Sequence, residues 1–189
     1  IKFGDFVGRV GLVFDTRDNE LDPHRGVFLE ALYAGGDGYS RRTAQAHAYV
    51  QPFEPLTIAA RVGVEAMPGD PPLAPLTLME SSEQPFVAMG GYYSLRGYYD
   101  GRFAGPGKLL GGLEARYSLV WAPSVLEVKL VGFYDVGRVF GPGEEVAFTT
   151  DGLHHGGGGE LAVRFGRNSL ITAGVGFGAE GSQFLFGTT

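Results

Sequence analysis

Few residues in this chain have the types and spacing that catalysis or metal binding requires. Ser94 does not lie in a Gly-x-Ser-x-Gly turn, so a serine hydrolase is not indicated. His154 and His155 stand together before a run of glycines at 156–159, with no carboxylate at a metal-ligand spacing, and we interpret them as part of a flexible loop. The chain has no cysteine, which removes thiolate chemistry and disulfides. We predict no catalytic residue, no metal site and no cofactor.

Charged residues on neighbouring strands are the stronger signal. Glu114 and Asp135 fall on the polar faces of two successive predicted strands, where they could be neighbours across an antiparallel pair. Two unpaired carboxylates in such a wall would be costly, and an arginine can bridge both because its guanidinium offers five donors in a rigid fork. Arg96, in the long segment before these strands, is either such a bridge or a solvated loop charge.

The composition narrows the class of protein. Of 189 residues 32 are glycine, more than twice the ordinary ~7%, without the three-residue period of collagen. Apolar residues make up 44%, too many for a disordered chain, yet no run of 18 apolar residues predicts a transmembrane helix. A net charge of −6 argues against a nucleic-acid partner. A soluble β-protein or a membrane β-barrel remains.

Alternation of apolar and polar residues is the dominant pattern, and it indicates β-strands. In the segment 57–66 the even positions form an aliphatic face opposite Thr57, Arg61 and Glu65. The glycines at 156–159 could kink a strand or narrow a wall to admit a partner, and we favour the kink. Similar patterns predict nine strands, at roughly 3–16, 26–35, 42–53, 56–67, 107–121, 124–140, 157–166, 169–179 and 182–188.

Three features favour a barrel in lipid over a soluble sandwich. The polar faces carry compensating charges, as Glu114 with Arg116 and Glu127 with Lys129 do, which suits a polar lumen. The apolar faces are long enough for tilted membrane strands. Tight turns alternate with longer connections at 36–41, 68–106 and 141–156, an asymmetry typical of outer-membrane barrels. We therefore predict an all-β fold, an antiparallel transmembrane β-barrel with eight to ten strands in this chain.

Several short motifs carry a resemblance to a known family. In chain order they are DTRDNELDPHRG at 15–26, LRGY at 95–98, GLEARY at 112–117, FYDVG at 133–137 and QFLFG at 183–187. Together they resemble the BamA/TamA superfamily of outer-membrane barrels, the bacterial surface-antigen family. The tetrapeptide alone is weak evidence, but it becomes strong evidence when a glutamate and an aspartate follow on the next two strands.

The resemblance implies more than the residues alone do. The family has a 16-stranded barrel, and residues 1–189 would form a single domain similar to its last nine strands, without the periplasmic POTRA repeats. The family's sixth extracellular loop folds back into the lumen, which implies the same for 68–106. The tip of that loop would be Leu95, Arg96, Gly97 and Tyr98. We hypothesise that Arg96 locks this loop inside the barrel through Glu114 and Asp135.

The function implied is assistance in the insertion or translocation of proteins at the bacterial outer membrane. The expected partners are outer-membrane lipid and unfolded outer-membrane or secreted polypeptide. Nine strands are too few for the family's barrel, and a homo-oligomer or a missing upstream barrel segment would supply the rest. The start at Ile1 indicates a fragment or a removed leader. The alternative is a passive membrane anchor or oligomerising barrel of a larger secreted protein, of the patatin-like type, without transport of its own.

Overall fold

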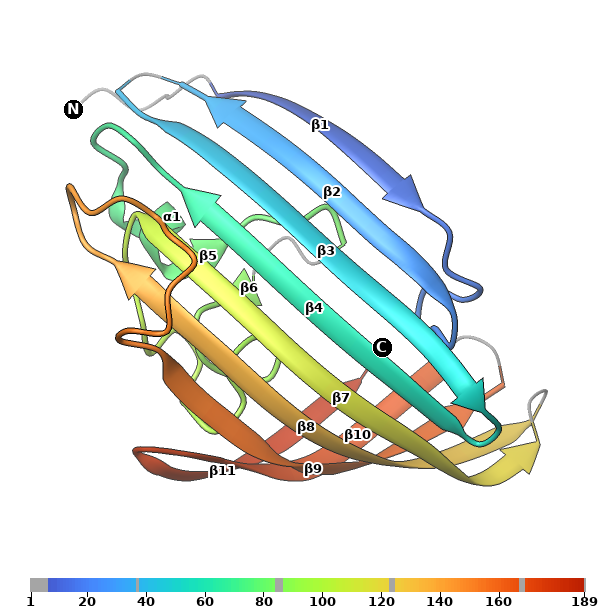
Figure 1. Ribbon diagram of the computed structural model, residues 1–189. Helices are drawn as coiled ribbons and strands as arrows, with labels where there is room; N and C mark the ends of the chain where they lie inside the picture. Colours follow the sequence, from blue (N-terminus) through green and yellow to red (C-terminus); the bar gives the residue numbers. More distant parts are fainter. Residues whose placement is uncertain (1–6, 37, 84–86, 123–124, 167–168, 189) are drawn as a thin grey trace.

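Nine antiparallel strands form one continuous sheet, in which neighbours in the sheet also follow one another along the chain (Figure 1). The computed structural model describes residues 7–36, 38–83, 87–122, 125–166 and 169–188. The strands are β1 (Gly8–Asp15), β2 (Gly26–Gly35), β3 (Ser40–Phe53), β4 (Leu56–Ala66), β7 (Gly107–Ala122), β8 (Leu126–Phe140), β9 (His154–Phe165), β10 (Ser169–Gly178) and β11 (Gly181–Thr188). The predicted all-β class and its nine strands are confirmed. Residues 3–6 and 124 of the predicted strands lie outside the described residues.

The start of β9 differs from the prediction. The strand begins at His154, so the interpretation of His154 and His155 as loop residues is wrong. The glycines at 156–159 continue the ladder without a register shift, each paired with both β8 and β10, so they do not kink the strand. Glycine weakens a strand by itself, but pairing on both sides holds this segment extended.

The sheet is apolar on its convex face and charged on its concave face. Leu113, Leu130 and Leu161 point outward and are 55%, 51% and 43% exposed. Glu127 and Asp135 point inward and are fully buried. A water-soluble protein arranges these residue types the other way round, whereas a barrel wall in lipid requires this arrangement. The apolar residues of the alternating pattern therefore form the membrane-facing surface, and the polar residues form the interior.

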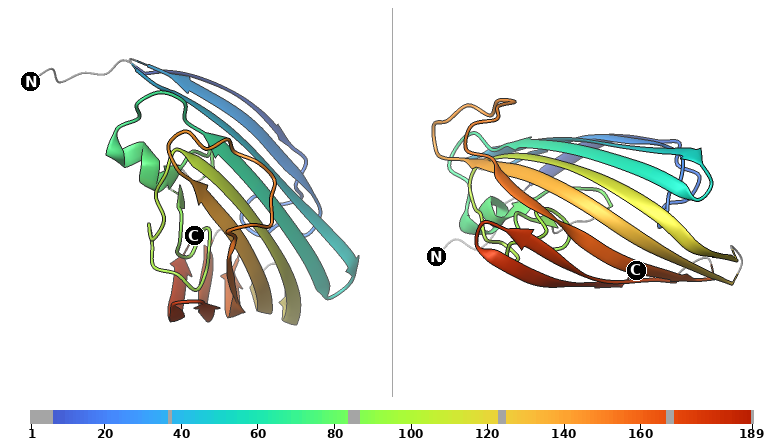
Figure 2. Two further views of the ribbon diagram at one scale, coloured as in Figure 1. Left: turned by 60° about the vertical axis from the view of Figure 1, so that its left-hand side comes forward. Right: turned by 60° about the horizontal axis from the view of Figure 1, so that its bottom comes forward.

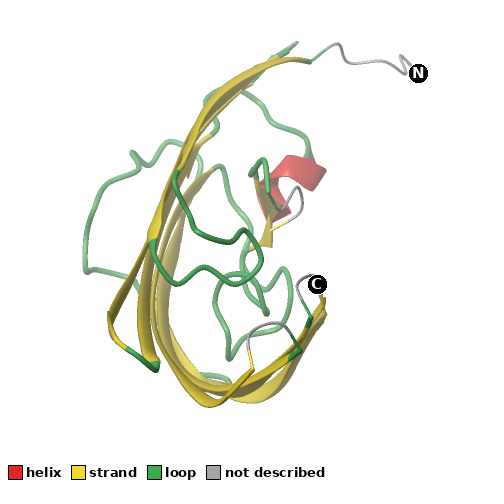
Figure 3. Ribbon diagram, turned by 90° about the vertical axis from the view of Figure 1, so that its right-hand side faces the viewer, coloured by secondary structure: helices red, strands yellow, loops and turns green. Residues whose placement is uncertain are grey.

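A long segment fills the concave side of the sheet. This inner loop, residues 67–106 between β4 and β7, contains the short helix α1 (Leu73–Thr77) and the two-residue strands β5 (Leu78–Met79) and β6 (Val87–Ala88). Figures 2 and 3 show the sheet curving around α1 and the inner loop. The loop predicted at 68–106 is thus in place, although it has more secondary structure of its own than the sequence pattern indicated.

The connections fall at two ends of the strands. The first connection (residues 16–25) and residues 54–55 lie at what we call the turn end. The inner loop and the outer loop (residues 141–153, between β8 and β9) lie at the opposite, loop end. Among the described residues, no helix has the length and apolar character needed to span a bilayer. The sheet order starts at β1 and finishes at β11, which are therefore its two edge strands.

Candidate functional site

The tip of the inner loop is a series of tight turns that present Arg96 to the sheet. The Gly91 amide donates to the Leu95 carbonyl at 3.2 Å, and the Tyr98 amide donates to the same carbonyl at 3.3 Å. The Ser94 hydroxyl accepts the Gly90 amide at 2.8 Å and is buried. Ser94 therefore stabilises a turn in this loop.

The Arg96 side chain is 5% exposed and lies among carboxylates from three strands. Its Nε and Nη2 donate to the two oxygens of Asp135, at 2.7 Å and 3.0 Å. Its Nη1 lies 2.7 Å from Glu114 Oε1 and 3.3 Å from Glu160 Oε1. The guanidinium carbon also lies 3.8 Å from the centre of the Phe133 ring. A forked, charge-assisted pair with Asp135 is among the stronger polar contacts that a protein makes.

The strand register brings these carboxylates together. Glu114 on β7 pairs with Phe133 on β8, so Asp135 is its diagonal neighbour, two residues along on the same face. Glu160 on β9 pairs with Val131, one row further toward the turn end. Glu160 lies in the strand predicted at 157–166, but nothing in the sequence indicated that Arg96 reaches it.

A second arginine at the site was also missed. Arg61 of β4 donates from Nη2 to Asp135 Oδ1 at 3.0 Å. It also donates to the backbone carbonyls of Tyr93 and Ser94, at 2.7 Å and 2.6 Å. Asp135 thus accepts from two guanidinium groups, and Arg61 holds the loop backbone directly.

The backbone at the loop tip approaches the sheet too closely for a side chain. Gly97 has a φ of 105°, and a Cβ there would lie 2.6 Å from the carbonyl carbon of Phe177. A Cβ on Gly156 would lie 2.0 Å from the Arg96 carbonyl oxygen, and one on Gly176 would lie 2.6 Å from the Gly97 nitrogen. Contacts this short do not occur in real structures, so these positions need glycine. The glycines of β9 narrow the wall to admit the inner loop.

The residues on either side of Arg96 and Gly97 pack against the wall. Leu95 is fully buried, in a cluster with Met79, Met89, Tyr98 and Leu110. The Tyr98 hydroxyl donates to the His155 carbonyl and accepts the Ala179 amide, both at 3.2 Å. All four residues of the predicted loop tip therefore touch the sheet or its core.

The histidines of β9 take part in packing. The His154 ring stacks on Phe103 of the inner loop, with ring centres 4.1 Å apart. His155 is exposed, and its Nδ1 lies 2.7 Å from the Tyr134 hydroxyl. The two rings thus lie on opposite faces of β9, one against the inner loop and the other on the convex side.

The base of the inner loop is held by a separate buried cluster. Glu65, fully buried on β4, accepts from Lys108 Nζ at 2.6 Å and from Arg41 Nε at 2.7 Å. It also accepts the Glu80 amide of the loop at 2.8 Å. The inner loop is therefore fixed at its base as well as at its tip.

A further charged cluster lies near the turn end, and of its members only the pair Glu127 and Lys129 was indicated by the sequence. Asp22, in the first connection, is 3% exposed, and both its oxygens lie 2.6 Å from Lys129 Nζ of β8. Arg164 of β9 donates to Asp22 at 3.2 Å and to Glu127 at 2.7 Å. Arg116 of β7 lies 3.9 Å from Asp22. The first connection therefore crosses the concave face from β1 and β2 to β7, β8 and β9.

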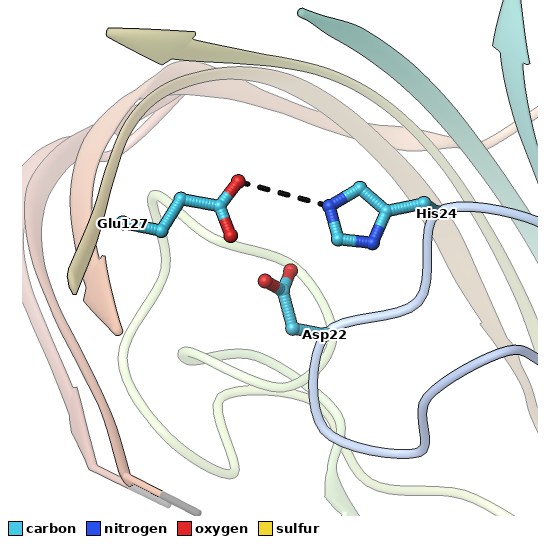
Figure 4. Close-up of side chains that lie close together, drawn as sticks. All are labelled: Asp22, His24 and Glu127. Atoms are coloured by element: carbon cyan, nitrogen blue, oxygen red, sulfur yellow. Dashed lines mark ion pairs between the residues drawn. The ribbon is translucent and has the colours of Figure 1, made fainter. Parts of the chain in front are cut away.

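Asp22, His24 and Glu127 have the residue types of a metal site, with one potential ligand atom each within 4.8 Å of the others (Figure 4). His24 Nε2 lies 3.7 Å from Glu127 Oε1. However, Lys129 already contacts both oxygens of Asp22 and lies 3.2 Å from Glu127. A divalent cation would have to displace this buried ammonium group, so we interpret the cluster as a network of ion pairs.

Arg96 keeps its charge in this setting. Burial by itself lowers the pKa of its guanidinium, but the hydrogen bond to Asp135 and the charges of Glu114, Asp135 and Glu160 outweigh burial. The pKa of Arg96 is therefore raised above its ordinary value, and the cation persists at any pH at which the carboxylates are ionised.

A curved antiparallel sheet with an apolar outer face, a charged inner face and a loop folded inside has the architecture of an outer-membrane β-barrel wall. Residues 2–180 match the family model of the Omp85 superfamily domain. The chain therefore belongs to the Omp85 superfamily, whose members insert or translocate proteins at outer membranes. A search of curated proteins found none that matches the chain.

Proposed function

We propose that this chain assists the insertion or translocation of polypeptides at the outer membrane, with the inner loop held on the concave face by Arg96. The observation that carries the proposal is the buried Arg96 guanidinium, shared among Glu114, Asp135 and Glu160 within an Omp85 domain. The site has the features of a structural lock, because ion pairs to three strands and the face of the Phe133 ring hold the cation.

The ion pairs of Arg96 would hold the inner loop in place while the edge strands β1 and β11 remain available for pairing with another strand. β1 and β11 are the edge strands of the sheet, and an edge strand offers backbone donors and acceptors to another strand. A polypeptide, a second copy of the chain or further strands of the same barrel could pair there. A fixed inner loop keeps the wall at β9 and β10 in place during such exchange, since its tip fits the glycines of those two strands.

The experiment compares two arginines of the same loop. Arg96→Ala removes the lock, whereas Arg102→Ala removes an exposed pair with Glu180. Vesicles containing the parent protein should speed the insertion of a small unfolded outer-membrane barrel, measured by its shift in gel mobility. The Arg102→Ala protein should retain this effect and the Arg96→Ala protein should lose most of it. The proposal fails if the parent protein neither speeds insertion nor conducts ions.

A passive anchor is the second candidate, and one observation favours it. The inner loop and the first connection are both pinned by buried ion pairs to β7, β8 and β9, so the concave face is occupied from both ends. In that case the protein would remain in vesicles without speeding insertion, and Arg96→Ala would reduce stability alone.

A further inference from the structure

The outer loop folds back over the convex face of the sheet. In Figure 1 this orange segment between β8 and β9 passes across the ends of β7 and β8, and in Figure 3 loop segments lie on the side of the sheet opposite α1. Arg138 of β8 holds it there, since its Nη1 donates to the Asp151 carbonyl at 2.7 Å and its Nη2 lies 3.6 Å from Glu144. The outer loop thus covers part of the surface that faces lipid.

A groove of about 620 Å³ lies between the outer loop and the sheet. Its floor is formed by the outward positions Val62 of β4, Leu109 of β7 and Val136 of β8, and by Gly111. Phe148, Thr149, Thr150 and Leu153 of the outer loop form the opposite side.

The outer loop covers one end of β7, and the exposure of the outward-facing leucines of that strand shows this. Leu109 is 7% exposed, whereas Leu113, four residues further along β7 and on the same face, is 55% exposed. Phe148, on the loop side of the groove, is 77% exposed. The groove therefore begins where the open apolar wall passes under the outer loop, and its lining contains no ionisable side chain.

This lining and position select one kind of occupant. The convex face of an outer-membrane barrel is surrounded by hydrocarbon, and the groove is continuous with that face. Aliphatic and aromatic side chains pack against a methylene chain through many small dispersion contacts. We propose that the groove beneath the outer loop holds one acyl chain of an outer-membrane lipid and retains that lipid as a bound molecule.

The main test counts the lipids that the protein keeps. The protein is extracted from vesicles of defined phospholipid into mild detergent, and bound lipid is counted by native mass spectrometry. Val136→Trp fills the groove and should reduce the count by one lipid. Leu130→Trp, on the same face of β8 but away from the lining residues, should keep the count of the parent. Val62→Trp fills the groove from β4 and provides a second variant if Val136→Trp does not fold.

A fluorescence measurement tests whether the acyl chain lies beside the outer loop. The protein has a single tryptophan, so Phe148→Trp in a Trp121→Phe background reports on the outer loop alone. Acyl chains brominated near the headgroup should quench its emission, and filling the groove with Val136→Phe, which adds no second tryptophan, should reduce that quenching. Equal lipid counts in parent and groove-filled proteins would overturn the proposal. It is also overturned if the parent is a dimer that Val136→Trp dissociates, because a second copy would then be the occupant.

Discussion

Two charged clusters on the concave face are built on the same three strands with opposite polarity. Toward the loop end, β7, β8 and β9 present carboxylates around a cation from the inner loop: Glu114, Asp135 and Glu160 around Arg96. Toward the turn end they present cations around a carboxylate from the first connection: Arg116, Lys129 and Arg164 around Asp22. Glu114 and Arg116 pair with each other at 2.7 Å and join the two clusters. The charge order along the strands thus matches the charge of the segment that lies at each end.

The two segments differ in how much local structure they have. The first connection is organised by its own side chains, because Asn19 Oδ1 accepts the amides of Leu21 and Asp22 and Asp18 Oδ1 accepts those of His24 and Arg25. The inner loop is about four times longer than the first connection. Its tip is held more by residues that are far away along the chain. Closing a longer loop costs more entropy, by about 0.6 kcal/mol per doubling. We therefore expect the Arg96 cluster to matter more for stability than the Asp22 cluster.

The largest effect is expected from Arg96→Ala. It leaves Asp135, Glu114 and Glu160 facing one another, with Arg61 still paired to Asp135 and Arg116 still paired to Glu114. Breaking a buried pair costs about 3–5 kcal/mol. Urea unfolding of the protein in lipid vesicles measures the loss, with Arg102→Ala as the control in the same loop. Arg96→Lys should fall between the two, because an ammonium keeps the charge without the fork. A parent-like midpoint for Arg96→Ala would show that the loop tip is held by packing alone.

Gly97→Ala should come next. The backbone there has a φ of 105° and lies against Phe177, so the methyl group adds steric overlap to backbone strain of about 1–3 kcal/mol. Gly181→Ala is the matched control, because Gly181 has a φ of 122°, also outside the ordinary left-handed region, but open space around it. The difference in unfolding midpoint between these variants isolates the close approach to β10. No difference would mean that strain alone accounts for the effect.

Asp22→Ala should cost less, about 1–3 kcal/mol, since Glu127 remains as a partner for Lys129 and Arg164. The unfolding midpoint measures this loss, and Glu20→Ala, an exposed change in the same connection, should leave it unchanged. If Asp22→Ala destabilised the protein more than Arg96→Ala, the ranking of the two clusters would be reversed.

A charge exchange sharpens the same comparison. Asp22→Lys combined with Lys129→Asp restores opposite charges at the closest contact of the turn-end cluster. The double variant should be more stable than the sum of the single changes predicts, which a double-mutant cycle measures directly. Additive effects would show that Asp22 and Lys129 do not interact appreciably in the folded protein.

The smallest effect is expected from Glu160→Gln. Its Oε1 lies 3.3 Å from Arg96, which keeps its shorter contacts to Asp135 and Glu114, so a loss of about 0.5–1.5 kcal/mol is expected. Calibrated urea titrations can resolve this from the parent, and a loss as large as that of Arg96→Ala would contradict the ranking of the contacts.

Much of this molecule is determined by its sequence alone. Alternation set the nine strands and their inward and outward faces, because the side-chain period of a strand is fixed at two. The residues alone left Arg96 as either a bridge or a solvated loop charge, and the family resemblance carried by LRGY implied the bridge. Alternation also placed Glu114 and Asp135 on the polar faces of successive strands. The strands and their faces are local features, and the nearness of Glu114 and Asp135 follows from one strand pairing with the next.

The tertiary structure decided which charges meet across the interior. Alternation places Arg61 and Glu65 together on the polar face of β4, yet Arg61 reaches Asp135 while Glu65 binds Arg41 and Lys108. Asp22 has the sequence context of a turn residue, but its carboxylate pairs with Lys129 on the concave face of β8. Such contacts depend on the curvature of the sheet and on the paths of two connections over its concave face. The alternation within a single strand predicts neither the curvature nor these paths, because both arise only when the nine strands and their connections fold together.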